Sequence, residues 1–112
     1  MTTRRTAKTN GYKLQKDVAN LVRERFSLEE RDVVSTPSSV QGEDILLTKK
    51  ARNLFPFSVE CKYRENMSIY SYWEQTTTNC GNNTPLLILK AKRKPILACI
   101  EIEVLLNLLG NT

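Results

Sequence analysis

The sequence predicts an α/β domain in which a mixed five-stranded sheet is flanked by helices, in the order α-β-β-β-α-β-β-α. Apolar residues recur at helical spacing near both ends of the chain and in its middle, whereas short alternating or wholly apolar runs lie between these segments. A helical segment stands between two apolar strand-like runs, which predicts a parallel crossover beside an antiparallel meander. A chain of 112 residues suffices for one domain with one modest core.

The first helix is predicted from Gly11 to Phe26, because apolar residues fall on one face at helical spacing. The face comprises Leu14, Val18, Leu21, Val22 and Phe26. Residues 1–10 are rich in Thr and Arg and have no apolar core, so they do not resemble a secretory signal. We therefore expect a flexible basic arm over residues 1–10 and a single domain over residues 11–112.

Three strands are predicted after this helix. They span Arg31–Thr36, Glu43–Thr48 and Phe55–Tyr63. Gln41-Gly42 is a turn signal before the second strand, and Lys49–Asn53 is read as a polar connection to the third. The second and third strands lie close in sequence, so we expect them to pair antiparallel.

The second half of the chain predicts a helix, two strands and a short final helix. Asn66 or Ser68 could cap the helix that ends at Asn79. Pro85–Leu89 is apolar throughout and is expected to be a buried central strand. The remaining segments are the basic turn Lys90–Lys94, the strand Pro95–Ile100 and the helix Glu101–Leu109, with Val104, Leu105, Leu108 and Leu109 expected to face inward.

The formal net charge of +5 is concentrated in two clusters. The clusters are Arg4, Arg5, Lys8, Lys13 and Lys16, and Lys90, Lys92, Arg93 and Lys94. Dense local clusters of this kind favour a polyanion partner such as DNA, and all nine residues are candidate DNA contacts. The simpler interpretation is a solvated surface.

The cysteine and histidine content excludes several kinds of site. Cys61, Cys80 and Cys99 are odd in number and lack C-x-x-C spacing, so we expect reduced thiols in a cytoplasmic protein. The chain has no histidine, which excludes histidine-based nucleases, Ser-His-Asp chemistry and Cys-His zinc sites. No apolar run approaches the roughly 18 residues that would span a bilayer.

The strongest chemical signal lies in the strand Phe57–Tyr63, where apolar and polar residues alternate. Glu60 and Lys62 therefore point to the same side. The carboxylate can bind a hard divalent cation, and the lysine can orient or deprotonate an attacking water. The alternative is a surface ion pair that contributes less than about 1 kcal/mol.

Asp44 begins the second strand and can lie across from Glu60 and Lys62 if the two strands pair. Two carboxylates, a lysine and a nearby main-chain carbonyl, such as that of Cys61, form a site that favours Mg²⁺ or Mn²⁺. The alternative is that Asp44 caps a turn. Glu43 points to the opposite face, so we rank it below Asp44.

Asp44 followed by Glu60-x-Lys62 resembles the signature of the PD-(D/E)xK nuclease superfamily, and the order of elements resembles its restriction-endonuclease-like fold. The resemblance covers about Gly11 to Leu109 and implies a nuclease domain. The chain departs from the signature where Glu43 replaces the proline before the aspartate, although that proline is not a ligand.

Within the superfamily, the chain is most similar to the small Holliday-junction resolvases of archaea and phages. The similarity rests on the basic arm, a first helix that opens after a glycine, a Ser-rich turn at residues 35–39, and the final strand, basic turn, strand and short helix. It implies a homodimer that uses Mg²⁺ or Mn²⁺ to cut branched DNA during DNA recombination, in the host cytoplasm if a phage encodes it. No membrane association or organic cofactor is implied.

The same resemblance implies two further site residues. The first helix of these resolvases supplies an acidic metal ligand, and the matching position is near Gln15, with Asp17 close by. Gln15 can offer a neutral carbonyl oxygen only. Gln75 resembles a catalytic glutamine that some branches place on the helix after the Glu-x-Lys strand; the alternative is a solvated helix residue.

The leading hypothesis is therefore a metal-dependent endonuclease acting on branched DNA, with Asp44, Glu60, Lys62 and Gln75 as catalytic residues. One alternative is a nuclease of this fold that cuts single-stranded, flap or duplex DNA. Another is a non-catalytic nucleic-acid-binding module, which the missing first-helix glutamate would favour. A third is an interaction protein whose charges are only solvated, which would show no salt-dependent DNA binding.

Overall fold

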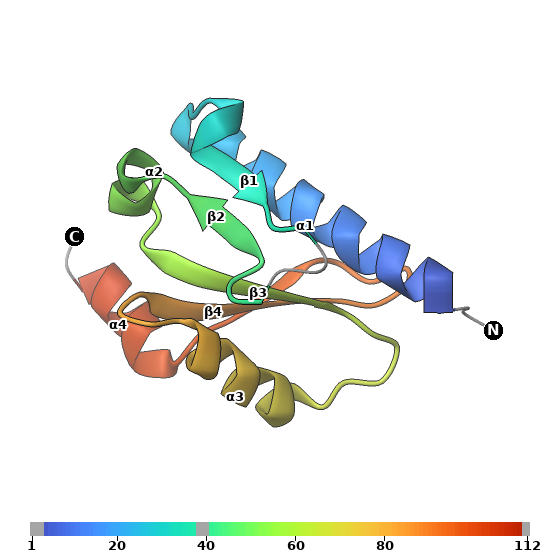
Figure 1. Ribbon diagram of the computed structural model, residues 1–112. Helices are drawn as coiled ribbons and strands as arrows, with labels where there is room; N and C mark the ends of the chain where they lie inside the picture. The colour runs from blue at the N-terminus through green and yellow to red at the C-terminus, as the bar shows by residue number, and fades with distance from the viewer. Residues whose placement is uncertain (1–3, 38–40, 111–112) are drawn as a thin grey trace.

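The computed structural model describes residues 4–37 and 41–110 (Figure 1), without the side chains of Arg4 and Arg5. Ser38 and Ser39 of the predicted turn lie outside the described residues. The elements follow the order α1-η1-β1-β2-α2-β3-α3-β4-β5-α4, so the α/β class is confirmed. No helix in the described part of the chain combines the length and apolarity needed to cross a bilayer.

Helix α1 runs from Arg4 to Phe26. It begins seven residues before the predicted start at Gly11, so most of the predicted arm is helical. Residues 4–10 contain no proline or other helix breaker, and their Arg, Ala and Lys residues favour a helix. Leu14, Val18 and Val22 are buried as predicted, whereas Leu21 is 55% exposed because it lies just off the buried stripe.

The strands form two sheets, so the predicted single five-stranded sheet is wrong. The first sheet pairs β1 (Val33–Ser35) with β2 (Ile45–Leu47) antiparallel. In the second sheet β4 (Thr84–Lys90) lies between its parallel partner β3 (Phe57–Tyr63) and its antiparallel partner β5 (Leu97–Cys99). Helix α3 (Ile69–Asn79) links β3 to β4, which confirms the predicted parallel crossover.

A short helix separates the two sheets. The expected polar connection is instead helix α2 (Lys49–Leu54), capped by the Thr48 side chain and anchored by the buried Ala51. The chain therefore turns away after β2 instead of returning beside it, and the predicted antiparallel pairing of the second and third strands does not form. A backbone hydrogen bond of 2.8 Å from the Asp44 N–H to the Val59 carbonyl joins the sheets at this seam.

The core lies between α1 and the sheets, and α3 lies on the opposite side of the three-stranded sheet (Figure 1). Leu14 and Val18 of α1 belong to the same buried cluster as Val59 of β3 and Ile88 of β4. Leu87 is fully buried in β4. The prediction of a buried central strand is thus confirmed.

Helix α4 (Ile102–Gly110) differs from its prediction, because none of its residues is buried. Leu105 is 41% exposed and Leu108 is 51% exposed, although both were expected to face inward. The helix follows the edge strand β5 and lies at the end of the sheet (Figure 1). The apolar pattern reveals an apolar face but does not say what covers that face.

Candidate active site

Strand β3 holds Glu60 and Lys62 on one side of the sheet, as its alternation predicts. The Lys62 ammonium lies 3.6 Å from Glu60 Oε1. Only 6% of the Glu60 side chain and 14% of the Lys62 side chain are exposed, so this is not a solvated surface pair. Burial keeps both side chains in a narrow range of orientations.

Asp44 stands one residue before β2 and is held by its backbone on both sides. Its N–H donates to the Val59 carbonyl, and its carbonyl accepts from the Thr36 N–H, each at 2.8 Å. The Asp44 Oδ2 atom accepts a hydrogen bond of 2.7 Å from the Cys61 N–H. Asp44 is therefore fixed beside β3 although β2 and β3 form no ladder.

The environment disfavours ionisation of both carboxyl groups. Burial raises the pKa of Asp44, although the Cys61 N–H and the Lys62 charge oppose the shift. Burial also raises the pKa of Glu60, and the neighbouring Asp44 charge raises it further against the attraction of Lys62. A cation between these two carboxylates would favour their charged forms and so oppose both shifts.

These residues line one open cleft of about 440 Å³ beneath the N-terminal half of α1. It is lined by Ala7, Lys8, Gly11, Tyr12, Gln15, Asp44, Glu60, Cys61, Lys62 and Arg64. Gln15, matched to the family's acidic ligand position, is therefore in the cleft. Asp17 instead pairs with Lys13 at 2.8 Å and lines a separate cavity.

Two buried oxygen atoms in this cleft show what it can bind. Glu60 Oε2 and Gln15 Oε1 have no hydrogen-bond partner among the described residues. A buried acceptor without a donor is unfavourable, and a hard cation satisfies carboxylate and amide oxygens alike. The donor set thus fits Mg²⁺ or Mn²⁺, with two carboxylates and a neutral amide oxygen.

The acidic ligand set is small. Within residues 4–37 and 41–110, no three His, Cys, Asp or Glu side chains gather as a metal site. The third protein oxygen must therefore come from a neutral group such as Gln15 or a main-chain carbonyl. Such a site should bind a divalent cation more weakly than one with three carboxylates.

Two other acidic or amide candidates lie away from the cleft. Gln75 is exposed on α3, because the buried residue of this turn is the adjacent Thr76. The structure therefore does not bring Gln75 to the predicted site. Glu43 faces away from Asp44 and pairs with Arg52 at 3.0 Å, which agrees with its lower rank.

Several residues near the site were not predicted, and Asn79 is one of them, since it opposes the rise in the pKa of Glu60. The Tyr72 ring lies 5.5 Å from the Lys62 ammonium, and Tyr12 and Arg64 line the cleft. Arg64 follows Lys62 by two residues, so the strand period could have identified it. Tyr12 and Tyr72 come from helices, and their approach depends on packing that sequence patterns do not show.

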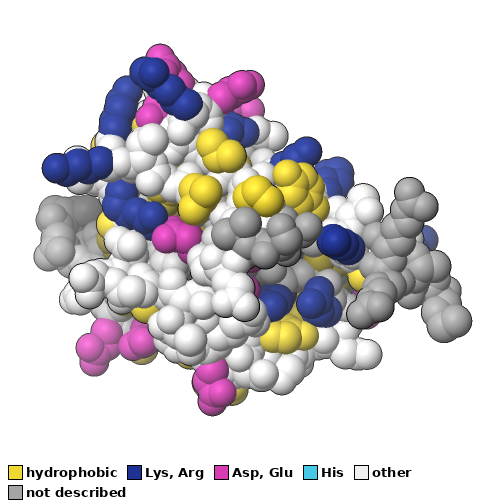
Figure 2. Space-filling view, viewed as in Figure 1, with side chains coloured by type: hydrophobic (Ala, Val, Ile, Leu, Met, Phe, Trp, Pro, Cys, Tyr) yellow, Lys and Arg dark blue, Asp and Glu magenta, His cyan; other side chains and the backbone are white. Residues whose placement is uncertain are grey.

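The predicted basic residues divide between the cleft and the surface. Lys8 lines the cleft, whereas Lys16 lies 4.7 Å from the centre of the Tyr12 ring. Lys90 donates to the carbonyls of Ala91 and Lys94, and residues 92–94 are exposed. On the face in Figure 2, Lys and Arg lie over the upper and middle parts, with Asp and Glu also present at the top, and the charged side chains along the lower edge are Asp and Glu.

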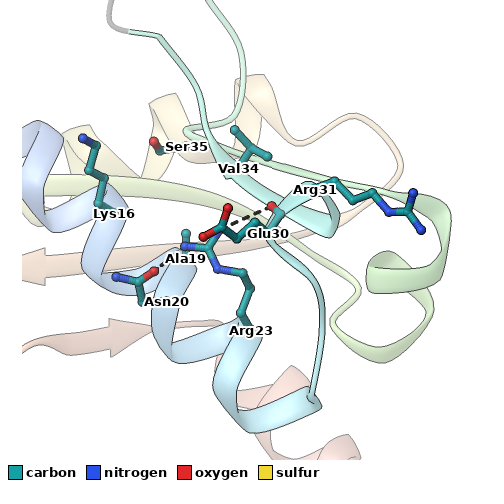
Figure 3. A pocket seen from close by; sticks show the side chains of 8 residues that line it. All are labelled: Lys16, Ala19, Asn20, Arg23, Glu30, Arg31, Val34 and Ser35. Atoms are coloured by element: carbon teal, nitrogen blue, oxygen red, sulfur yellow. Dashed lines mark hydrogen bonds between the residues drawn. The ribbon is translucent and has the colours of Figure 1, made fainter.

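A second groove follows α1 away from the cleft, between α1 and β1 (Figure 3). It measures about 620 Å³ and is lined partly by Lys16, Asn20, Arg23 and Ser35. Arg23 donates to the carbonyls of Val33 and Glu30 and to the Asn20 side chain, so it carries charge without a described carboxylate partner. This polar groove continues the basic side of α1 beyond the cleft.

A family model described as "Phage putative PDDEXK endonuclease" matches residues 1–112 of the chain. No curated protein and no solved structure matches the chain significantly.

Proposed function

We propose that this chain, which belongs to the phage putative PDDEXK endonuclease family, is a metal-dependent endonuclease that cuts branched DNA as a homodimer. The observation that carries this proposal is the meeting of Asp44, Glu60, Lys62 and Gln15 in one cleft, where two buried oxygens have no hydrogen-bond partner in the described part of the chain. Branched DNA is favoured by the resemblance to resolvases.

Asp44 and Glu60 hold the divalent cation in this proposal, with Gln15 and the main-chain carbonyl of Cys61 as neutral ligands. Bound Mg²⁺ or Mn²⁺ supplies Lewis-acid stabilisation of phosphate charge and lowers the pKa of a bound water. Lys62 orients the attacking water, because its ammonium is restrained by Glu60 and Tyr72. Gln75 is given no role in this proposal, because it is exposed on α3 and is not among the residues that line the cleft.

The phosphate backbone of DNA is held by basic residues around the cleft. Lys8 and Arg64 line the cleft itself, and Lys16 continues toward the groove between α1 and β1. Residues 92–94, which are far from these residues in the sequence, add an exposed basic turn. Contacts of this type position a nucleic acid without reading its sequence.

Gln15 favours a second candidate function, a nucleic-acid-binding module without catalysis. It places a neutral group where the related resolvases have an acidic ligand, and neutral oxygens hold a divalent cation less strongly. Such a module would bind DNA with strong salt dependence and would not cut it. A nuclease acting on single strands, flaps or duplexes is distinguished by substrate choice alone.

The test is incubation of the purified chain with a four-way junction, a duplex and single strands, each with Mg²⁺, Mn²⁺, Ca²⁺ or EDTA. We expect cutting of the junction with Mg²⁺ or Mn²⁺, and binding with little cutting in Ca²⁺, whose longer and looser coordination aligns the water poorly. Glu60→Gln is the inactive control. Binding without cutting under every condition would favour the module instead.

A further inference from the structure

Most of the large apolar side chains that the structure exposes gather at one end of the described molecule, on α3, β5 and α4. In α4, Ile102 is 64% exposed, Leu105 41%, Leu106 57% and Leu108 51%. A helix of nine residues with no buried residue cannot derive its stability from the monomer core. Its apolar face therefore requires a cover.

The neighbouring elements extend this apolar surface. Ile69, at 42% exposed, and Tyr70, at 85%, lie on α3, and Leu97, at 56%, lies on β5. An apolar groove joins the two helices, lined by Ile69, Tyr70, Trp73, Cys99, Ile100, Glu101 and Ile102. We define the α3–α4 face as this groove together with the exposed apolar residues of α4.

We propose that the α3–α4 face is the surface through which two copies of this chain form a twofold symmetric dimer. The proposal names the interface of the homodimer in the proposed function, and it rests on that function for the number of copies. A twofold contact places the same patch on both copies, so one self-complementary apolar face suffices.

The exposed apolar area agrees with the size of a dimer interface. The large apolar side chains of the face, from Leu105 at 41% exposed to Tyr70 at 85%, leave several hundred Å² of apolar surface in water. A standard interface takes about 800 Å² from each partner, of which somewhat over half is apolar. The face thus supplies the apolar share of one such interface.

Charge also favours a second copy over nucleic acid. The chain carries a formal charge of +5, so two copies repel each other wherever their basic surfaces meet. Helices α3 and α4 and strand β5 contain no Lys or Arg, and their charged residues are Glu74 and Glu103. This surface therefore repels DNA, and it is where two basic chains can approach most closely.

The proposed dimer leaves the cleft open. The residues that line the apolar groove are all different from those that line the cleft. Each copy would keep its own Asp44, Glu60 and Lys62 accessible to DNA. Two accessible sites on one particle are what paired cuts in a branched substrate require.

The test is the mass of the full-length chain in solution, measured by light scattering and sedimentation without DNA or metal. We expect a dimer of twice 12.8 kDa, and we expect Leu106→Glu to weaken dimerisation at least about 30-fold. Leu21→Glu is the matched control, because Leu21 is a helical leucine of similar exposure on α1. It should leave the dimer unchanged, and circular dichroism checks that both variants fold.

Thiol labelling provides an independent readout. Cys99 lines the groove, whereas Cys80 lies outside it and serves as an internal reference. Cys99 should react faster relative to Cys80 in Leu106→Glu than in the wild type. A wild-type monomer at all concentrations, or a dimer that survives Leu106→Glu, would overturn the proposal. A dimer that fails to cut DNA would count against the nuclease function and leave this interface intact.

Discussion

Replacing Arg52 with Met should destabilise the protein through the residue next to Asp44. Arg52 donates to the Phe57 carbonyl at 2.8 Å and to Glu43 Oε1 at 3.0 Å. The pair is mostly buried, with side chains 22% and 17% exposed. Met conserves much of the apolar stem, so the variant mainly removes the charge and its hydrogen bonds.

The magnitude follows from what is left behind. Breaking a fully buried pair costs about 3–5 kcal/mol, since one charge remains unpaired. Because about a fifth of each side chain is exposed, we expect roughly 2–3 kcal/mol for Arg52→Met. Adding Glu43→Gln should recover about 1–2 kcal/mol of this loss, because the double variant no longer holds an unpaired carboxylate.

The assay is urea denaturation followed by fluorescence of Trp73, the single tryptophan. With a slope of about 1–1.5 kcal/mol/M, the transition should shift by about 2 M. Arg31→Met is the control: its 2.8 Å pair with Glu29 is 82% and 63% exposed, so the change should stay under about 1 kcal/mol. Equal shifts for both variants, or no recovery in the double variant, would refute this reasoning.

Three other predictions concern the site, and a fourth concerns the exposed basic turn at residues 92–94. Lys62→Ala should abolish cleavage but retain DNA binding, and Lys62→Arg should not restore full activity; wild-type rates in a nuclease assay would place the site elsewhere. Gln15→Glu should lower the Mg²⁺ concentration at half-maximal rate, and an unchanged titration would remove Gln15 from the ligand set. The raised pKa of Glu60 means that the metal-free protein loses stability as pH rises from the ordinary carboxyl pKa to the raised one. In EDTA, the stability advantage of Glu60→Gln over the wild type should therefore grow between pH 4 and pH 7. Urea titrations of both proteins at the two pH values measure this difference. Alanine substitution of residues 92–94 should weaken binding to all DNA sequences alike and flatten the log–log salt dependence by roughly 0.9 per lost phosphate contact, and a change in sequence preference would contradict the phosphate-only role.

The order of elements could be predicted because it depends on local periodicity. The buried stripe of Leu14, Val18 and Val22 and the apolar run of β4 are strong local signals. The division into two sheets could not be predicted, since it depends on whether residues 49–54 turn the chain away. That outcome depends on the Thr48 cap and on the burial of Ala51. The burial of Ala51 is a tertiary contact, which local sequence patterns do not show.

The candidate site was predictable where a strand period or a motif carried it. Alternation in β3 places Glu60 beside Lys62, and the family resemblance points to Asp44 and Gln15. Gln75 does not line the cleft, and its position was hard to predict because a one-residue change of helix phase moves a side chain by about 100°. A motif predicts which type of residue a helix contributes to a site. Which residue of that helix reaches the site depends on which face of the helix is buried.

The seam between the two sheets has a consequence for the lifetime of the protein. Asp44 belongs to the first sheet's side of the seam and Glu60 to the second sheet. An ion bound by both carboxylates would link the two sheets. At a metal concentration 100 times its dissociation constant, it would add about 2.7 kcal/mol to the free energy of unfolding. Chains that lack the ion would open along the seam more often and be degraded by proteases sooner, so the supply of metal would set how much of the protein persists.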